Sequence, residues 1–164
     1  MKHIVVMILG LTLFAFCACK PPADEPQIQS EPDSISLGGP VSSSAVAVSP
    51  DGRLVVVVNP DSDSITLVDV ITLAVLAEIP VGDNPRTVSL TPDSKTALVA
   101  NHGSATISKV DLNQAVEIKQ YPVGSMPYGV VTDGVHAFVT EFGLGTVSII
   151  DLMTGELVNR IPVD

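Results

Sequence analysis

The sequence predicts an all-β protein built from three copies of one four-stranded unit, and three observations support this prediction. First, three landmarks recur with one spacing: Asn59, Asn101 and Glu141; Asp69, Asp111 and Asp151; and Pro80, Pro122 and Pro162, each set 42 and then 40 residues apart. Second, each copy holds four short runs rich in β-branched residues, which favour strands. Third, no stretch keeps apolar residues at helical spacing for about ten residues. Four short strands in a period of about 40 residues are typical of a β-propeller blade.

The first copy shows how each strand is recognised. The Val-rich run 54–58 is a strand signal, and the turn Pro50-Asp51-Gly52 before it suits a tight reversal. A loop at 60–63 separates this strand from the next one. The expected strands are 45–49, 54–58, 65–69 and 75–80 in the first copy, 87–91, 96–100, 106–111 and 115–121 in the second, and 129–132, 136–140, 146–151 and 156–161 in the third.

Linked motifs within the copies resemble a known family. They are Leu98-Val-Ala-Asn101 with Ala105-Thr-Ile-Ser108, Phe138-Val-Thr-Glu141 with Gly145-Thr-Val-Ser-Ile-Ile-Asp151, Ser49-Pro-Asp-Gly52, and Ile79-Pro-Val-Gly82. Over residues 35–164 these runs resemble the YVTN-type β-propeller repeats, although Glu141 replaces the Asn of the motif in the third copy. The predicted blades are about 45–82, 86–124 and 128–164, and the resemblance implies a ring that usually has seven.

Three blades do not close a ring, because propellers have roughly four to eight. We therefore expect the sequence to be the N-terminal part of a longer protein, with an oligomer that completes the ring as the alternative. Residues 35–37 lie one repeat before the strand that ends at Pro80. We expect this segment to be an isolated outer strand that would complete the last blade.

Composition limits the partners and the chemistry. With a formal net charge of −10 over 164 residues, the chain would repel nucleic acid, so no nucleic-acid partner is expected. Both cysteines, Cys17 and Cys19, lie near the N-terminus, so the repeats have neither a disulfide framework nor a thiolate metal site. The residues predict no metal and no cofactor.

The N-terminus has the pattern of a secretory signal peptide over residues 1–18. A short basic start precedes 15 largely apolar residues, fewer than the roughly 20 that a spanning helix needs. The run ends in Ala18-Cys19, which resembles the bacterial lipoprotein lipobox and implies lipidation of Cys19. An ordinary cleaved signal peptide and an uncleaved anchor are the alternatives.

Residues 19–34 are rich in proline and acidic side chains, which predicts an extended tether. Several acyl chains on Cys19 would anchor this tether to a membrane. The N-terminal sequence therefore predicts an extracytoplasmic lipoprotein of the cell envelope. By resemblance to lipoprotein sorting, Lys20 after the cysteine implies the outer membrane where one exists.

Four side chains with chemical capacity fall in loops that a propeller places on one face, where ligands commonly bind: Arg86, His102, Tyr128 and Glu141. His102 could act as a base or an axial haem ligand, or be an ordinary solvated histidine. Glu141 could act in catalysis or pair with Arg86 between blades. No catalytic residue is assigned. The aspartates that recur in every copy, such as Asp51 and Asp69, are expected to hold turns.

Two functions remain open on this sequence. The first is a lipid-anchored binding or scaffold module that presents its loop face to a protein, a polysaccharide or a small ligand. The alternative is the N-terminal part of a propeller enzyme or redox protein, lactonase-like or haem-associated, since the resemblance includes such proteins. The residues shown favour the binding module over the enzyme.

Overall fold

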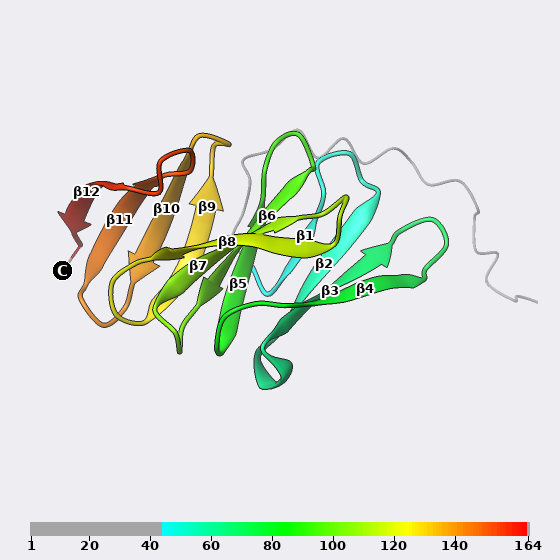
Figure 1. Ribbon diagram of the computed structural model, residues 1–164, viewed down its shortest axis with the longest axis horizontal. Coiled ribbons are helices and arrows are strands. Elements are labelled where there is room, and N and C mark those ends of the chain that lie inside the picture. The colour runs from blue at the N-terminus through cyan, green and yellow to red at the C-terminus, as the bar shows by residue number, and fades with distance from the viewer. Residues whose placement is uncertain (1–43, 164) are drawn as a thin grey trace, which may run out of the picture. The chain divides into compact units, whose positions relative to one another are not determined.

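The computed structural model describes residues 44–163, which form twelve β-strands and one short 3-10 helix (Figure 1). The strands make three four-stranded antiparallel sheets, which confirms the predicted all-β fold class. Blade 1 holds β1 (Val46–Val48), β2 (Leu54–Asn59), β3 (Ser64–Asp69) and β4 (Val75–Pro80), with the helix η1 (Pro60–Ser62) between β2 and β3. Blade 2 holds β5 (Pro85–Leu90), β6 (Thr96–Asn101), β7 (Thr106–Asp111) and β8 (Val116–Pro122). Blade 3 holds β9 (Pro127–Thr132), β10 (His136–Glu141), β11 (Thr146–Asp151) and β12 (Leu157–Pro162).

The predicted signal peptide, the lipidation site Cys19, the tether and the strand at 35–37 lie outside the described residues. Within residues 44–163, no helix is long and apolar enough to cross a membrane.

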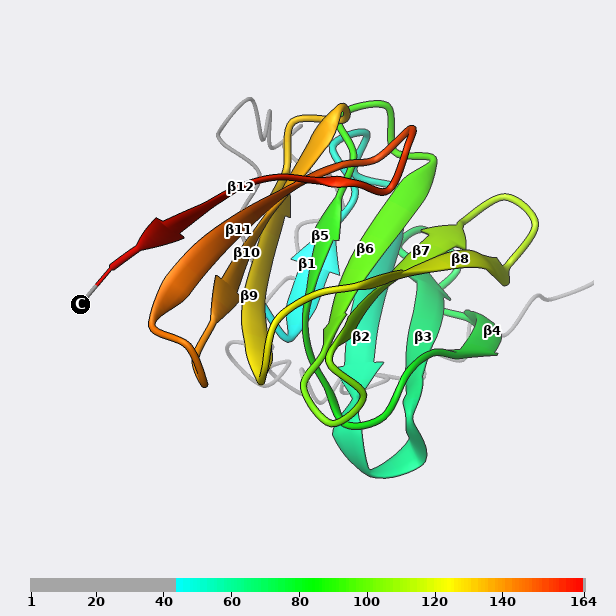
Figure 2. The same ribbon diagram turned by 60° about the vertical axis from the view of Figure 1, so that its left-hand side comes forward.

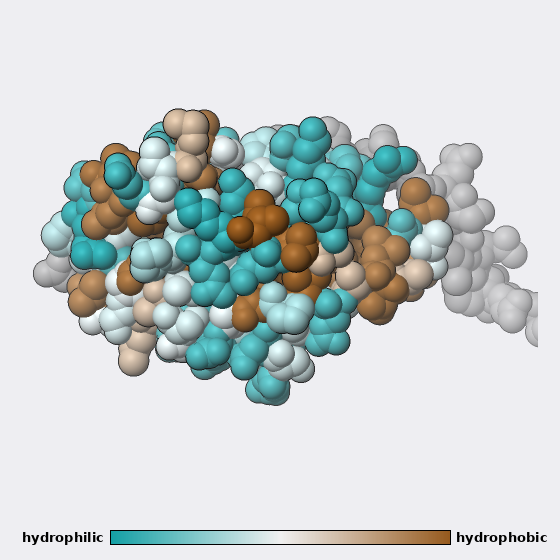
Figure 3. Space-filling view, viewed as in Figure 1, coloured by the Kyte–Doolittle hydropathy of each residue, from teal (hydrophilic) through white to brown (hydrophobic). Residues whose placement is uncertain are grey.

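Apolar residues fill two interfaces between successive blades, whose stacking is visible in Figure 2. In β6, Ala97 and Val99 belong to the core shared with blade 1, whereas Leu98 and Ala100 belong to the core shared with blade 3. Successive side chains of a strand point to opposite faces, so a strand covered on both sides has a continuous apolar run. All four of these residues are fully buried. Blade 1 has blades on one side only among the described residues, and hydrophobic surface shows over its β3–β4 end in Figure 3.

The repeat is also present in the backbone conformation. Three loop positions in each blade have positive φ, again spaced by 42 and 40 residues. They are Gly52, Ser94 and Gly134; Asp63, Ala105 and Gly145; and Leu73, Ala115 and Gly155. A left-handed conformation costs an L-residue roughly 1–2 kcal/mol. The turn geometry therefore imposes strain at Leu73, Ala105 and Ala115.

The repeated aspartates hold turns, as predicted. Asp51 Oδ1 accepts a hydrogen bond from Arg53 N at 3.1 Å, and Asp69 Oδ1 accepts one from Ile71 N at 2.9 Å. The corresponding residues Asp93, Asp111, Asp133 and Asp151 make equivalent bonds. In blade 3, bonds from the backbone N–H groups of His136 and Val135 lower the pKa of Asp133 to about 2.

Candidate ligand-binding site

The loops predicted to share one face lie together at one end of the blades, the lower end in Figure 1. Hydrogen bonds join the inter-blade loops to the β6–β7 and β10–β11 loops. His102 N donates to Asn84 O at 3.0 Å, and Phe142 N donates to Met126 O at 3.0 Å. We call this end the loop face.

Arg86 occupies a β-bulge at the loop-face end of β5. Pro85 pairs with Asn101 and Thr87 pairs with Ala100, so Arg86 is the extra residue. Bulges often re-aim a side chain next to a functional site. The Nε atom of Arg86 is buried and has no hydrogen-bond partner among the described residues. Because a buried donor without an acceptor costs free energy, an acceptor on a ligand would be stabilising here.

His102 lies at the same end of blade 2, directly after the residue that pairs with Pro85. Its Nδ1 is also buried and without a partner in the part of the chain that the structure describes. The His102 ring meets Tyr128 of blade 3 edge-on, with ring centroids 6.4 Å apart and planes at 90°. Thr87, next to Arg86, donates to Tyr128 O at 2.6 Å. The structure therefore gathers Arg86, His102 and Tyr128 at the junction of blades 2 and 3.

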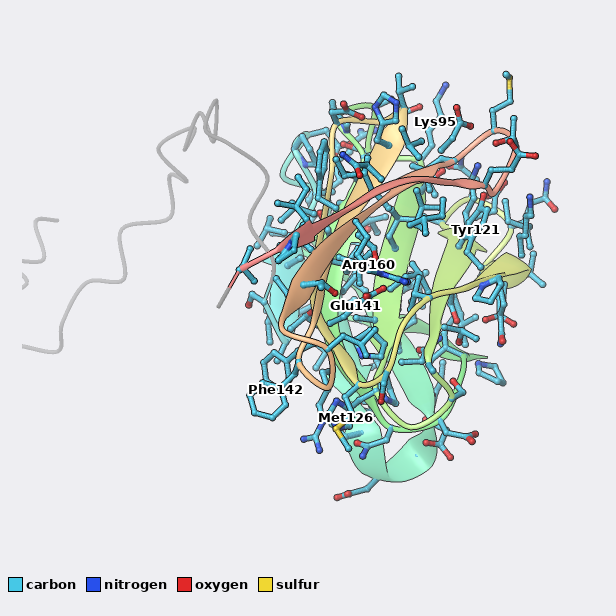
Figure 4. The ribbon with its side chains drawn as sticks, turned by 90° about the vertical axis from the view of Figure 1, so that its left-hand side faces the viewer. Lys95, Tyr121, Met126, Glu141, Phe142 and Arg160 are labelled. Carbon is cyan, nitrogen blue, oxygen red and sulfur yellow. The ribbon has the colours of Figure 1, made fainter. Side chains whose placement is uncertain are left out.

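Glu141, the fourth predicted site residue, is buried in blade 3 and only 1% exposed. Its Oε2 lies 3.0 Å from Arg160 Nε of β12 (Figure 4), so the hypothesis that Glu141 pairs with Arg86 is wrong. Its carboxylate also accepts hydrogen bonds from Ser148 Oγ at 2.6 Å, Thr146 Oγ1 at 2.7 Å and Gly124 N at 2.6 Å.

Burial raises the pKa of Glu141, but the bonds from Ser148, Thr146 and Gly124 and the nearby Arg160 together outweigh burial and lower the pKa. A carboxylate that is ionised and engaged in this way is a poor general base. We therefore assign Glu141 a structural role beneath the loop face.

Sequence reasoning missed Arg160 and three exposed apolar residues on the loop face, Met126, Phe142 and Leu144. Alignment of the copies would have shown them. Position 160 corresponds to Gln120 in blade 2, and the three apolar positions correspond to polar residues there.

The described residues offer no obvious metal site, since no group of three or more His, Cys, Asp or Glu in residues 44–163 could hold a metal ion. A cleft of about 370 Å³ lies at the opposite end of blades 2 and 3, lined by Asp93, Lys109 and Asp133 among others. It contains none of the four predicted site residues.

These features define a partial β-propeller with a polar site on its loop face. Residues 24–119 match the family described as lactonase, 7-bladed beta-propeller, and the chain belongs to this family. No curated protein matches the sequence.

Three solved structures share the fold. The chain is similar to Kuenenia stuttgartiensis hydrazine synthase, with 32% identity and a TM-score of 0.68 over 82% of this chain and 39% of that chain. It is also similar to the dihydro-heme d1 dehydrogenase NirN in complex with DHE, with 17% identity and a TM-score of 0.60 over 74% of this chain and 28% of that one. For apo AztD from Citrobacter koseri, the identity is 16% and the TM-score 0.58, over 68% and 32% of the two chains. The chain thus spans between 28% and 39% of these structures.

Proposed function

We propose that the chain is part of a binding module that holds the anionic group of a ligand on its loop face. The observation that supports this most is the pair of buried donors without partners, Arg86 Nε and His102 Nδ1. A carboxylate would accept hydrogen bonds from both when the His102 ring carries a proton on Nδ1. The Arg86 guanidinium is always charged, and its planar shape matches a carboxylate.

A local cation is needed because the chain as a whole is acidic, with a net charge of −10. Long-range repulsion of an anion is screened over about 8 Å at physiological salt, whereas a charge-assisted hydrogen bond acts at contact. The half-exposed Tyr128 ring, in edge contact with His102, would form one wall of the site.

The N-terminal sequence supports a location for this module outside the cytoplasm, on a lipid anchor at Cys19, with repeats of the YVTN type. In cells that process lipoproteins, the wild-type chain should enter the detergent phase of a Triton X-114 extract, and Cys19→Ser should stay in the aqueous phase. Identical partitioning of the two would contradict lipidation.

Calorimetric titration with benzoate, and with uncharged benzamide for comparison, tests anion binding. We expect the full chain to bind benzoate in preference to benzamide. Arg86→Gln should weaken benzoate binding about tenfold or more, because a hydrogen bond to a charged group contributes roughly 1.5–3 kcal/mol.

Arg53→Gln is the matched control, since it removes the same charge from the turn before β2, at the opposite end of blade 1. It should bind benzoate like the wild type. No benzoate binding, or equal binding by the wild type and Arg86→Gln, would overturn the proposed function.

Membership of a lactonase family favours lactone hydrolysis as a second candidate. Water would add to the ring carbonyl and the acyl C–O bond would break, giving a hydroxy acid whose carboxylate suits Arg86. His102 would take the proton from water. Acid release from glucono-δ-lactone, followed with a pH indicator, should then exceed the spontaneous rate, and His102→Asn should abolish the excess. Equal rates would remove this candidate.

A haem-associated role has less support. The NirN chain is 17% identical, and likeness at that level shows the fold alone.

A further inference from the structure

Blade 3 presents apolar side chains at loop-face positions that are polar in blade 2. The repeat spacing, 42 residues in the inter-blade loops and 40 in the loops between the second and third strands, matches the positions in pairs. The pairs, with blade 2 first, are Asn84 and Met126, Arg86 and Tyr128, His102 and Phe142, and Ser104 and Leu144. Blade 2 satisfies the fold with polar residues at these positions, so the fold does not require the apolar ones.

These four side chains, the apolar platform, face solvent. Phe142 is 78% exposed, Tyr128 52%, Leu144 49% and Met126 45%. Figure 4 shows Phe142 and Met126 at the loop-face end, below the buried pair of Glu141 and Arg160. Single exposed apolar residues are common, but several gathered on neighbouring loops mark a binding surface.

The two loops that carry the platform are held to each other before any ligand binds. Phe142 N donates to Met126 O at 3.0 Å, and Gly143 N donates to Ser125 O at 3.1 Å. A Cβ on Gly143 would lie 2.7 Å from Ser125 Oγ, so this close approach requires glycine. A surface that is already ordered loses less conformational entropy when it binds.

We propose that the ligand of the loop face is an aromatic carboxylate, with its flat apolar body on the platform and its acid group at Arg86 and His102. This inference rests on the proposed function and adds the chemical class of the ligand. The edge contact of His102 with Tyr128 joins the two unpartnered donors to the platform as one surface. Aromatic rings pack well on such a surface, in offset or edge-on geometry.

Charge on the same face favours a small ligand over an anionic membrane or a second copy of the chain. Asp61 and Asp63 lie in the β2–β3 loop, and Asp83 lies in the loop between blades 1 and 2. These carboxylates would repel anionic lipid. A second copy carries the same net charge of −10.

Titration of the full chain with acetate, benzoate and 2-naphthoate tests the platform. Affinity should rise along the series, about tenfold from benzoate to 2-naphthoate, because the larger ring buries more apolar surface. Phe142→Ser should weaken 2-naphthoate binding about tenfold and leave acetate binding unchanged. The matched control is Met153→Ser, which removes a side chain that is 85% exposed in the β11–β12 turn, away from the loop face.

The outcomes separate this inference from the proposed function. If Phe142→Ser binds 2-naphthoate like the wild type while Arg86→Gln does not bind it, the platform is overturned and the anion site stands. If neither substitution changes binding, both are overturned. Binding to phosphatidylcholine vesicles that Phe142→Ser abolishes, without any effect of that substitution on 2-naphthoate, would assign the platform to a membrane and overturn the inference.

Discussion

Glu141 and Arg160 form a buried ion pair in blade 3, with 3.0 Å between Oε2 and Nε, at a position where blades 1 and 2 carry asparagines. In blade 2, Asn101 Nδ2 donates to Thr106 Oγ1 at 3.0 Å and to Ser108 Oγ at 2.7 Å. The carboxylate in blade 3 instead accepts hydrogen bonds, including one from Gly124 N in the loop that enters the blade. The pair therefore fixes the base of the platform loops.

Replacing Glu141 with Gln should lower the free energy of unfolding by about 1–3 kcal/mol. The substitution leaves the charge of Arg160 without its partner, and removal of one member of a buried pair is destabilising. The effect is smaller than for a fully buried pair because the Arg160 side chain is 39% exposed. Urea denaturation measures it. An unchanged midpoint would contradict the assigned role.

The double variant Glu141→Asn, Arg160→Gln places the residues of blade 2, Asn101 and Gln120, into blade 3. It should be more stable than the sum of the single effects predicts, with a coupling energy of about 1 kcal/mol, because the two side chains contact each other. A double-mutant cycle in urea gives this number. Strict additivity would show that the pair contributes nothing as a pair.

Acid should destabilise the protein between about pH 4.5 and about pH 2. Folding lowers the pKa of Glu141 from 4.5 and that of Asp133 to about 2. Carboxylates with lowered pKa stabilise the fold above their unfolded pKa and lose this contribution as pH falls through the folded value. The Tm should therefore decline across this range, and less so at its lower end in Asp133→Asn. A Tm that is constant from pH 5 to pH 2 would contradict these pKa directions.

Ala115→Gly should raise the free energy of unfolding by about 0.5–1 kcal/mol. Ala115 has φ of +52°, and the equivalent residue in blade 3 is Gly155. Relief of the left-handed strain should exceed the added entropy of the unfolded chain. Ala77→Gly, within β4, is the control and should destabilise by about 1 kcal/mol. If both substitutions destabilise equally, the turn is not strained at Ala115.

Tyr121→Phe should cost about 1 kcal/mol of stability. The Tyr121 hydroxyl is buried and donates to Leu152 O at 2.8 Å, so its loss leaves a carbonyl of blade 3 without this partner. Tyr128→Phe is the control, because the Tyr128 ring is half exposed. Thermal unfolding of the two variants should separate them. Equal Tm values would mean that the Tyr121 bond contributes nothing net.

Much of the fold was predictable because it follows from local patterns. Strand alternation, turn chemistry and the 42- and 40-residue spacing gave the strands, the turn aspartates and the end of the blades where the loops gather. The burial on both sides of blade 2 was equally readable, since Ala97 to Ala100 is an unbroken apolar run.

The site was only partly predictable. That Arg86, His102 and Tyr128 meet depends on a bulge in β5 and on contact between blades, which local patterns do not encode. The burial of Glu141 depends on Arg160, a residue that is 19 positions away and approaches through the β11–β12 pairing. The apolar platform was present in the sequence, but it becomes meaningful only when exposure is known.

The most direct test of the central claim, a ligand site at the junction of blades 2 and 3, is a ring-carbon NMR titration with benzoate. The sequence has three histidines and two tyrosines, so the signals can be assigned by substitution. Signals of His102 and Tyr128 should move together on one saturation curve, while His136 and Tyr121 stay in place. Movement of His136 or Tyr121 instead, with His102 unchanged, would contradict the account.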